Sequence, residues 1–331
     1  MSTDSIKQIH SFADEILADT EFSLVKPISH NGISFVPIIL TEEARDQEYL
    51  NAAEALERGV LVITEAGDAV NTILAQNTGD KPVLIEEAEI LVSPNSQDRM
   101  VVASVIIQPG EETRIPVKCV HAPHGLRRGS SYGTLGLAAG PMKSVMRSMK
   151  YQSIMTDVEH YQPETAVDQG TVWKEVERYC KTYGIEDTSR YSEAILKLQR
   201  IAKESAEEIR GLLPEDTCGF IAIGPDGKVI AMEFYRNRQS LQSRSGVFET
   251  LALEHGDPNR NPVADEAAWS EALQLMFQLK DAKPEEVLSK DGQDSVVIGL
   301  SEMHGEAVTG ETREGDLKVF YCSLSKVIPS T

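Results

Sequence analysis

The feature that most constrains the fold is a series of short apolar runs at regular spacing, separated by turn signals. We expect strands at 60–64, 69–76, 82–92, 99–107 and 113–121. Asn77-Thr78-Gly79-Asp80 and Pro109-Gly110 supply turns between these strands. Strands of this length and spacing favour an antiparallel sheet or sandwich.

Helical spacing of apolar residues flanks this β-rich region. Residues 3–17 predict an amphipathic helix, 46–58 a short one that ends at Gly59, and the stretch from Pro141 a helix with Met142, Met146 and Met149 on one face. That methionine stripe suits a core, although methionine also forms adaptable binding surfaces. Residues 168–213 predict two helices, the first with Val172, Trp173, Val176 and Tyr179 inward. Residues 125–140 are expected to be a surface loop and 151–168 a linker.

The C-terminal part predicts a hairpin from Gly219 to Phe234 around Pro225-Asp226-Gly227. Helices at 239–254 and 265–279 follow, the second with Trp269 and Phe277 inward, and then strands at 295–300, 305–309 and 317–324. The fold class is therefore α+β, with an antiparallel, sandwich-like β-rich core and a helical middle segment. We expect an N-terminal helix over 1–19 and one domain over 20–331: β-rich at 20–125, loop and helix at 125–150, helical at 168–213, and β/α at 217–331. The two β regions should share one core, because the second has too few strands to bury a sheet alone.

Composition excludes several classes of protein. The 331 residues carry a net charge of -20, which argues against nucleic-acid binding because that needs clustered Lys and Arg. No apolar run approaches the roughly 18 residues of a membrane span, and the first residues do not resemble a signal peptide. The cysteines have no CxxC spacing and are expected to be free thiols. We therefore expect a cytoplasmic protein with neither a membrane nor a nucleic-acid partner.

Polar residues concentrate between Lys81 and His124. If 82–92 is one strand, Glu87 and Glu89 lie on the same face as the apolar Val83 and would need partners when buried. Arg99 opens the next strand, so a hairpin would bring it across the ladder from Leu91 or Glu89, and we expect a sheltered Glu89–Arg99 ion pair. Alternatively, Glu86 and Glu87 lie on a solvated edge and the Glu89–Arg99 pair is structural.

A second constellation is Cys119, His121 and His124. Their Cys-x-His-x-x-His spacing offers zinc ligands, which makes them weak metal candidates. The alternative is a buried thiol beside a hydrogen-bonded histidine. Activation of Cys119 as a nucleophile by His121 as its base is disfavoured, since same-side neighbours on a strand are about 7 Å apart.

The glycine-rich loop after His124 contains Arg127 and Arg128. Guanidinium groups and approachable backbone N–H groups can cradle a phosphate, although a solvated flexible loop has the same composition. A P-loop signature is absent, and Gly224-Pro-Asp-Gly227 is a hairpin turn rather than a dinucleotide fingerprint. No cofactor is therefore identified by the sequence.

The chain resembles the ARG- and rhodanese-phosphatase-superfamily-associated protein domain, a family named for genes near ADP-ribosylglycohydrolases and phosphatases. The matching segments are Ala52 to Glu65, Asn77 to Val83, Ala88 to Leu91, Gln97-Asp98-Arg99, Pro109-Gly110 and Ile115 to Val120, with downstream similarity at 168–173, 219–234 and 300–319. This sequence has Ala88 where the family has glycine, one extra residue before Gln97, and His121 where the family has glutamate. The tryptophan expected shortly after that glutamate is missing. If that glutamate is functional in relatives, His121 marks a divergent or inactive member. The resemblance implies Glu89, Gln97, Arg99 and Cys119 as site residues and an association with NAD or ADP-ribose metabolism.

Two hypotheses of function follow. The first is a ligand-binding or regulatory protein for a phosphorylated small molecule, in which Gln97, Asp98, Arg99, Arg127 and Arg128 contact the ligand. The second is a hydrolase or transferase acting on an ADP-ribose- or NAD-type substrate, with Glu87 or Glu89 as acid–base and His121 as a further catalytic candidate. The first is favoured because no nucleophile–base pair or complete metal set can be named.

Overall fold

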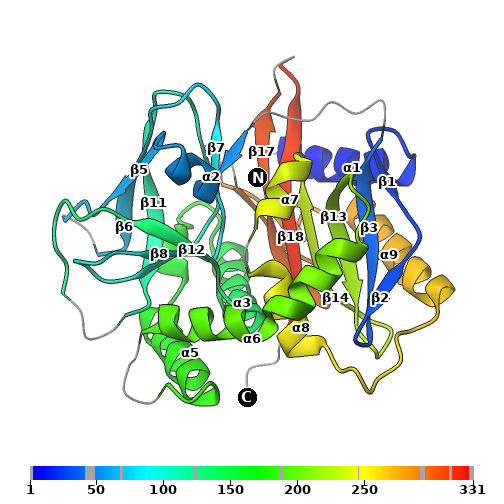
Figure 1. Ribbon diagram of the computed structural model, residues 1–331. Coiled ribbons are helices and arrows are strands. Elements are labelled where there is room, and N and C mark those ends of the chain that lie inside the picture. The colour runs from blue at the N-terminus through cyan, green and yellow to red at the C-terminus, as the bar shows by residue number, and fades with distance from the viewer. Residues whose placement is uncertain are drawn as a thin grey trace.

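Two β units lie side by side in the computed structural model, with helices between and around them (Figure 1). The structure describes residues 3–41, 49–67, 70–121, 125–185, 190–244, 246–290, 295–312 and 315–327. The chain first forms an edge of the right-hand unit, then builds the left-hand unit, and returns to complete the right-hand one (Figure 1). The expected α+β class with antiparallel sheets is confirmed.

The right-hand unit is one antiparallel sheet in the order β1-β3-β13-β14-β18-β17-β16-β15, with β2 also paired to β3. Its strands are β1 (Phe22–Leu24), β2 (Ile28–His30), β3 (Ile33–Leu40), β13 (Thr217–Ile223), β14 (Val229–Tyr235), β15 (Val287–Leu288), β16 (Ser295–Gly299), β17 (Met303–Glu311) and β18 (Leu317–Lys326). The predicted 219–234 hairpin is β13 and β14, and Gly227 in its turn has a φ of 74° that suits glycine.

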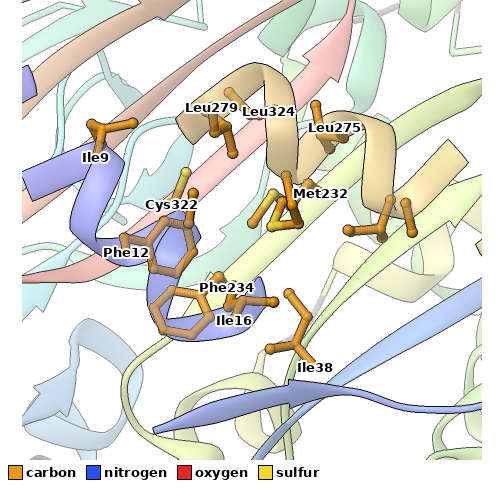
Figure 2. Close-up of a cluster of buried hydrophobic side chains, with 14 of the residues drawn as sticks. Ile9, Phe12, Ile16, Ile38, Met232, Phe234, Leu275, Leu279, Cys322 and Leu324 are labelled. Carbon is orange, nitrogen blue, oxygen red and sulfur yellow. The ribbon is translucent and has the colours of Figure 1, made fainter. Parts of the chain in front are cut away.

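Helices cover both faces of this sheet. On one face, α1 (Thr3–Leu17) and α9 (Asp265–Lys280) pack together over the strands. Figure 2 shows Phe12 of α1 against Phe234 of β14, with ring centroids 4.5 Å apart. The other face is covered by α6 (Tyr191–Leu212), α7 (Arg238–Ser243) and α8 (Val247–His255). The helix predicted over 3–17 is confirmed, because its periodic Ile9, Phe12 and Ile16 are the residues that it buries.

The left-hand unit is a sandwich. A six-stranded sheet has the order β12-β8-β9-β11-β6-β5, and a three-stranded sheet has the order β10-β7-β4. The strands are β4 (Leu50–Asn51), β5 (Leu61–Thr64), β6 (Thr72–Asn77), β7 (Val83–Ile85), β8 (Glu89–Val92), β9 (Arg99–Val101), β10 (Val105–Ile107), β11 (Glu112–Cys119) and β12 (Gly133–Leu137). Their facing side chains form one apolar cluster, in which Ile85 and Ile107 meet Leu91 and Val117.

Three helices cover the opposite face of the six-stranded sheet: α3 (Gly140–Thr156), α5 (Gln169–Thr182) and α6. The predicted methionine stripe is confirmed as core, since Met142 and Met146 of α3 are buried there. The helical segment at 168–213 is α5 and α6. Another apolar cluster takes Leu84 and Ile106 from the left-hand unit and Phe220 and Val308 from the right-hand one. The division of the chain into domains stays a prediction.

The hairpin expected over 82–107 has the right register but is broken in the middle. Ile85 pairs with Val105 and Ile90 with Met100, which is one continuous antiparallel register. However, β7 and β10 belong to the three-stranded sheet, whereas β8 and β9 belong to the six-stranded one. Residues 86–88 and 102–104 leave the ladder between them. The expectation that Glu87 and Glu89 share one strand face is therefore wrong.

Ala88 makes this break possible. Its φ of 67° is left-handed, and its backbone N–H donates to the Val101 carbonyl at 2.8 Å. The left-handed region costs a residue with a Cβ about 1–2 kcal/mol. Glycine adopts this region without that cost. The alternation of apolar and polar residues gives no sign of such a reversal, because a single left-handed residue does not alter the pattern on either side.

Several other boundaries differ from the sequence predictions. The helix expected over 46–58 begins at Ala52 as α2 (Ala52–Glu57), because Asn51 and Glu54 form a capping box; residues 42–48 lie outside the described chain. The expected loop at 125–140 contains β12, whose pairing with β8 is bulged at Gly136. The expected linker contains the end of α3 and α4 (Pro163–Ala166).

Two predictions about later helices were also wrong. The helix expected over 239–254 is divided into α7 and α8. Gly246, which precedes α8, has a φ of 96°, a conformation that favours glycine. It also lies close to Leu137, because an added Cβ would be 3.1 Å from the Leu137 carbonyl oxygen. Trp173 and Phe277 were expected to point inward but are 43% and 50% exposed. Each sits at the margin of an apolar stripe, where helical periodicity does not decide which side is covered.

The left-handed Ala88 yields a stability prediction. Replacing Ala88 with glycine should change the free energy of unfolding by less than about 1 kcal/mol, because relief of the backbone offsets the lost methyl and the flexibility of glycine. The same substitution at Ala75, buried in β6, should cost about 1–2 kcal/mol because no relief offsets it. Urea denaturation measures both values. Equal losses at the two positions would contradict the strained backbone.

Candidate functional site

A network of buried charges lies where the broken hairpin meets α3 and the right-hand sheet. We call it the junction network, and its members are Glu86, Glu87, Glu89, Lys143, Arg147, Lys150, Glu233, Arg244 and Glu306. All of these side chains are buried. Charges so removed from water persist only when they are paired and hydrogen-bonded.

Glu87 is held by two cations of α3. Its carboxylate accepts from Arg147 Nε at 2.8 Å and lies 2.6 Å from Lys150 Nζ. Lys150 also binds Glu306 of β17, and Glu306 accepts from the backbone N–H of Ser104 at 2.6 Å. One backbone group freed by the break, the Ser104 N–H, is thereby satisfied by a side chain of the right-hand sheet. The Val102 carbonyl accepts from Lys150 at 2.9 Å, and the Glu87 N–H donates to the Ser104 hydroxyl at 2.7 Å.

Glu86 and Glu89 share Arg244. Arg244 Nε lies 2.8 Å from Glu86 Oε1, and the same guanidinium binds Glu89, which also accepts from the Thr134 hydroxyl. The Tyr235 hydroxyl donates to Glu86 at 2.8 Å. The predicted Glu89–Arg99 pair is wrong, because Arg99 pairs instead with Glu65 at 3.0 Å. Nothing in the sequence order of Glu89 and Arg99 indicated that their partners, Arg244 and Glu65, come from distant segments.

The junction network holds five carboxyl groups and four cations, so the carboxyl groups do not all have a cation of their own. Burial raises the pKa of Glu86 to about 7, against the opposing attraction of Arg244. Burial also acts on Glu87, but the Arg147 and Lys150 cations hold its pKa below the ordinary value. Glu87 therefore stays ionised at neutral pH and has no proton to donate.

Five other predicted residues gather at the ends of β9 and β11. We call this group the strand-end cluster: Gln97, Asp98, Arg99, Cys119 and His121. Structural partners that the sequence did not indicate complete it. The Tyr132 hydroxyl donates to Glu65 at 2.8 Å, beside Arg99, and also to the Gln97 carbonyl at 3.2 Å. Asp98 accepts from Arg190 at 2.7 Å and from the Ser192 hydroxyl at 2.6 Å.

Cys119 and His121 contact each other through the backbone. The backbone N–H of His121 donates to Cys119 Sγ at 3.4 Å, and the Gln169 side chain holds both backbone groups of Cys119. Burial raises the pKa of the Cys119 thiol, so the thiolate is disfavoured. Among the residues that the structure describes, no group of three His, Cys, Asp or Glu side chains could hold a metal ion, and the third candidate, His124, lies outside them.

The two arginines of the predicted phosphate loop are on the surface. Arg127 and Arg128 are exposed, and the side chain of Arg128 lies over Gly67, where an added Cβ would be only 2.7 Å away. The structure thus separates the predicted site residues into three places. Glu87 and Glu89 lie in the junction network, five residues form the strand-end cluster, and the two arginines lie in an exposed loop.

A cavity of about 510 Å³ opens beside the junction network, between the start of α3, α8 and the adjoining strands β14 and β18. Its walls are mainly apolar, with Pro141, Ile230, Val247, Leu251, Leu253 and Leu324 among them. The polar residues that line it are Lys143, Arg147, Tyr183, Glu233, Thr250, Glu254, His255, Ser325 and Lys326. This volume and this lining are typical of small-molecule sites. Glu87 and Glu89 do not line this cavity.

The cavity retains unused hydrogen-bond donors. Arg147 gives one N–H each to Glu87, Ser323 and Ser325, which leaves two of the five N–H groups of a guanidinium. Lys143 donates to Glu233 at 3.2 Å and has two further N–H groups. The Thr250 hydroxyl is buried and has no hydrogen-bond partner within the described chain. These donors are cationic or neutral, so they suit an anion.

Sequence reasoning missed this cavity, although one signal was present. Lys143, Arg147 and Lys150 follow one another at i, i+4 and i+7 on a helix whose methionines were expected to be buried. A line of three cations beside a buried stripe indicates that buried carboxylates must lie opposite. The apolar walls come from segments far apart in the sequence, and periodicity cannot bring those segments together.

These features define an α+β protein with a sandwich and a large antiparallel sheet joined by buried ion pairs, and with a small-molecule-sized cavity at the joint. The chain belongs to the ARPP-1 family, the ARG and Rhodanese-Phosphatase-superfamily-associated Protein domain, whose sequence profile matches residues 21–320. The family resemblance found in the sequence is thereby confirmed. Comparisons with curated proteins and with solved structures gave no match. Among the described residues, no helix has the length and apolar character needed to cross a membrane.

The pairing in the junction network can be measured by double-mutant cycles. Removing Arg244, by Arg244→Met, should cost about 3–5 kcal/mol because it leaves buried Glu86 and Glu89 without a cation. The double variant Arg244→Met/Glu89→Gln should lose less stability than the sum of the losses of the two single variants, and the difference should be about 1–3 kcal/mol.

The matched control is the pair Glu89→Gln and Arg99→Met. Because Glu89 and Arg99 belong to different networks, their effects on the free energy of unfolding should add within about 0.5 kcal/mol. Coupling between Glu89 and Arg99, combined with additivity for Glu89 and Arg244, would contradict the assignment.

Proposed function

We propose that the protein binds a small anionic molecule with an apolar body in the cavity between α3, α8, β14 and β18. The observation that carries this proposal is the set of unused donors from Lys143, Arg147 and Thr250 in the wall of a mainly apolar cavity. A buried hydroxyl without a partner costs free energy, and a ligand oxygen would satisfy it. The two cations supply charge-assisted bonds, which are stronger than neutral ones.

A phosphorylated ligand suits this donor set, because phosphate oxygens accept several hydrogen bonds at once. A nucleotide or a derivative of ADP-ribose or NAD has both the anionic groups and a flat, partly apolar base for the remaining walls. The link to ADP-ribose rests on the family resemblance alone, while the anionic character of the ligand rests on the cavity. The free thiol state of the four buried cysteines supports a cytoplasmic location.

Binding explains the geometry better than acid–base catalysis by Glu87 or Glu89. Both carboxylates are enclosed by cations and lie behind the wall of the cavity. Arg147 stands between Glu87 and the cavity and is the residue through which the junction network reaches a ligand. The role that fits Glu87 is to fix the orientation of Arg147.

The first test is titration with 1-anilinonaphthalene-8-sulfonate, a fluorescent anion with apolar rings. Lys143→Met should weaken its binding by about tenfold or more, because a charge-assisted hydrogen bond is lost. Lys174→Met, at an exposed position of α5, should leave the affinity unchanged. Thermal-shift measurements with ADP-ribose, NAD and AMP then rank natural ligand types, because a ligand that binds the folded state raises Tm. Equal affinity of the dye for the two variants would overturn the proposal.

Thr250→Val offers a test that leaves all ion pairs intact. The hydroxyl has no partner in the protein, so its removal should leave Tm unchanged or slightly higher, yet binding of the dye should weaken by about 2- to 10-fold. Thr217→Val is the matched control: its hydroxyl is also buried and unpartnered, but it lies in β13 away from the cavity. If both variants bind the dye equally well, Thr250 does not contact the ligand.

A further inference from the structure

Glu254, whose side chain is partly buried, differs from the more deeply buried acidic side chains that the structure describes. Each of those forms an ion pair with Lys or Arg: Glu15, Glu65, Glu86, Glu87, Glu89, Asp98, Glu233, Glu249 and Glu306. Glu254 lies in the last turn of α8 and lines the cavity. Its hydrogen-bond partner is the Tyr179 hydroxyl of α5, which lies 3.1 Å from Oε1. No ion pair is formed by Glu254 within the described chain.

The surroundings of Glu254 disfavour a negative charge. Leu251, Leu253 and Pro141 are its neighbours in the cavity wall, and the end of α8 is the negative end of that helix dipole. Burial raises the pKa of Glu254 to about 8, although Tyr179, the Gly140 N–H, Lys143 and Arg178 act in the opposite direction. The other titratable groups nearby are Tyr183 and Tyr191 on the α5–α6 side, Lys326 of β18 and the adjacent His255.

We propose that Glu254 takes part in ligand binding as a neutral carboxylic acid that donates a hydrogen bond. This inference rests on the proposed function, because it concerns the same cavity. Tyr179 occupies Oε1, whereas Oε2 lies beside Gly140, which itself lines the cavity. The cavity then selects a ligand that offers an anionic group to Lys143 and Arg147 and a hydrogen-bond acceptor, such as a carbonyl or ring nitrogen, to Glu254.

The protonation state of Glu254 sets the pH dependence of ligand binding. Below about pH 8 the neutral acid supplies a donor and no charge, so an anion is accepted. Above that pH the carboxylate repels the anion and loses its donor. In the free protein, the raised pKa of Glu254 also determines how the stability of the fold changes with pH. A carboxyl whose folded pKa is raised stabilises the fold fully below its ordinary value of 4.5, and that stability is lost as pH rises toward about 8.

The decisive experiment measures the affinity for 1-anilinonaphthalene-8-sulfonate between pH 6.5 and 9.5. The charge of this dye does not change over that range. In the wild type the affinity should fall by about 2- to 10-fold as pH rises through the Glu254 transition, whereas Glu254→Gln should show a flat profile and keep the low-pH affinity. His255→Gln removes another titratable group of the cavity wall and should retain the decline with pH, which assigns that decline to Glu254. A flat wild-type profile, or an equal decline in Glu254→Gln, overturns the inference.

The acceptor is tested with a matched pair of anions, 5-phenylpentanoate and 5-oxo-5-phenylpentanoate, as competitors of the dye. At pH 6.5 the keto acid should bind about 2- to 10-fold better than its parent to the wild type and to Glu254→Gln, since both side chains donate a hydrogen bond. Glu254→Met has no donor and should abolish the difference. Persistence of the preference in Glu254→Met would remove Glu254 from ligand recognition.

Stability measurements separate failure of this inference from failure of the proposed function. Between pH 5 and 8, Tm of the wild type should decline relative to that of Glu254→Gln whether or not a ligand is present. That decline without dye binding would overturn the proposed function and leave the neutral acid in place; dye binding without the decline would overturn the neutral acid.

If Glu254→Gln does not fold, Tyr179→Phe takes its place. Because this variant loses a donor to the carboxylate, the pH at which dye binding weakens should move upward. An unmoved transition overturns the inference.

Discussion

The structure depends on burying carboxylates at a break in one hairpin. Residues 86–88 carry Glu86 and Glu87 into the interior, and Glu89 follows at the start of β8. An isolated buried carboxylate is prohibitively costly, so these groups require cations on facing elements. Arg244 precedes α8, and Arg147 and Lys150 lie on α3. The positions of both helices are therefore set by charge as well as by apolar packing.

Helix α3 acts as the clamp between the two units. Its cations bind Glu87 of the left-hand unit and, at the same time, Glu233 and Glu306 of the right-hand sheet. Its apolar face packs on the six-stranded sheet through Met142 and Met146. Ion pairs have strict distance requirements, whereas apolar contacts tolerate sliding, so the network fixes the register of α3 between the sheets. The cavity lies at the first turns of α3, so the same ion pairs hold its polar side chains in fixed positions, as a binding site requires.

How far the sequence determines this arrangement varies with the kind of contact involved. Local patterns predicted α1, the methionine stripe of α3, the 219–234 hairpin and the antiparallel pairing of 82–92 with 99–107, because each depends on spacing within one or two segments. They did not predict the break at Ala88, since one left-handed residue leaves the alternation intact. The partners of Glu89 and Arg99 were missed for a different reason. Arg244 and Glu65 are distant in sequence, and long-range pairing leaves no periodic trace.

The family resemblance and the cavity share only part of their residues, because the similar segment 219–234 supplies Ile230, Ala231 and Glu233 to the cavity wall. The segments that carry the resemblance include Glu65, Glu89 and Arg99, and these side chains hold the scaffold together through buried ion pairs. They do not line the cavity. Lys143, Thr250 and Glu254, which do line it, lie outside those segments. The segments quoted for the resemblance are therefore informative mainly about the joined sheets, and the ligand has to be argued from the cavity itself. A relative could keep the ion pairs at the junction and still bind a different molecule by changing the side chains at the positions of Thr250 and Glu254, because neither residue contributes an ion pair to the scaffold.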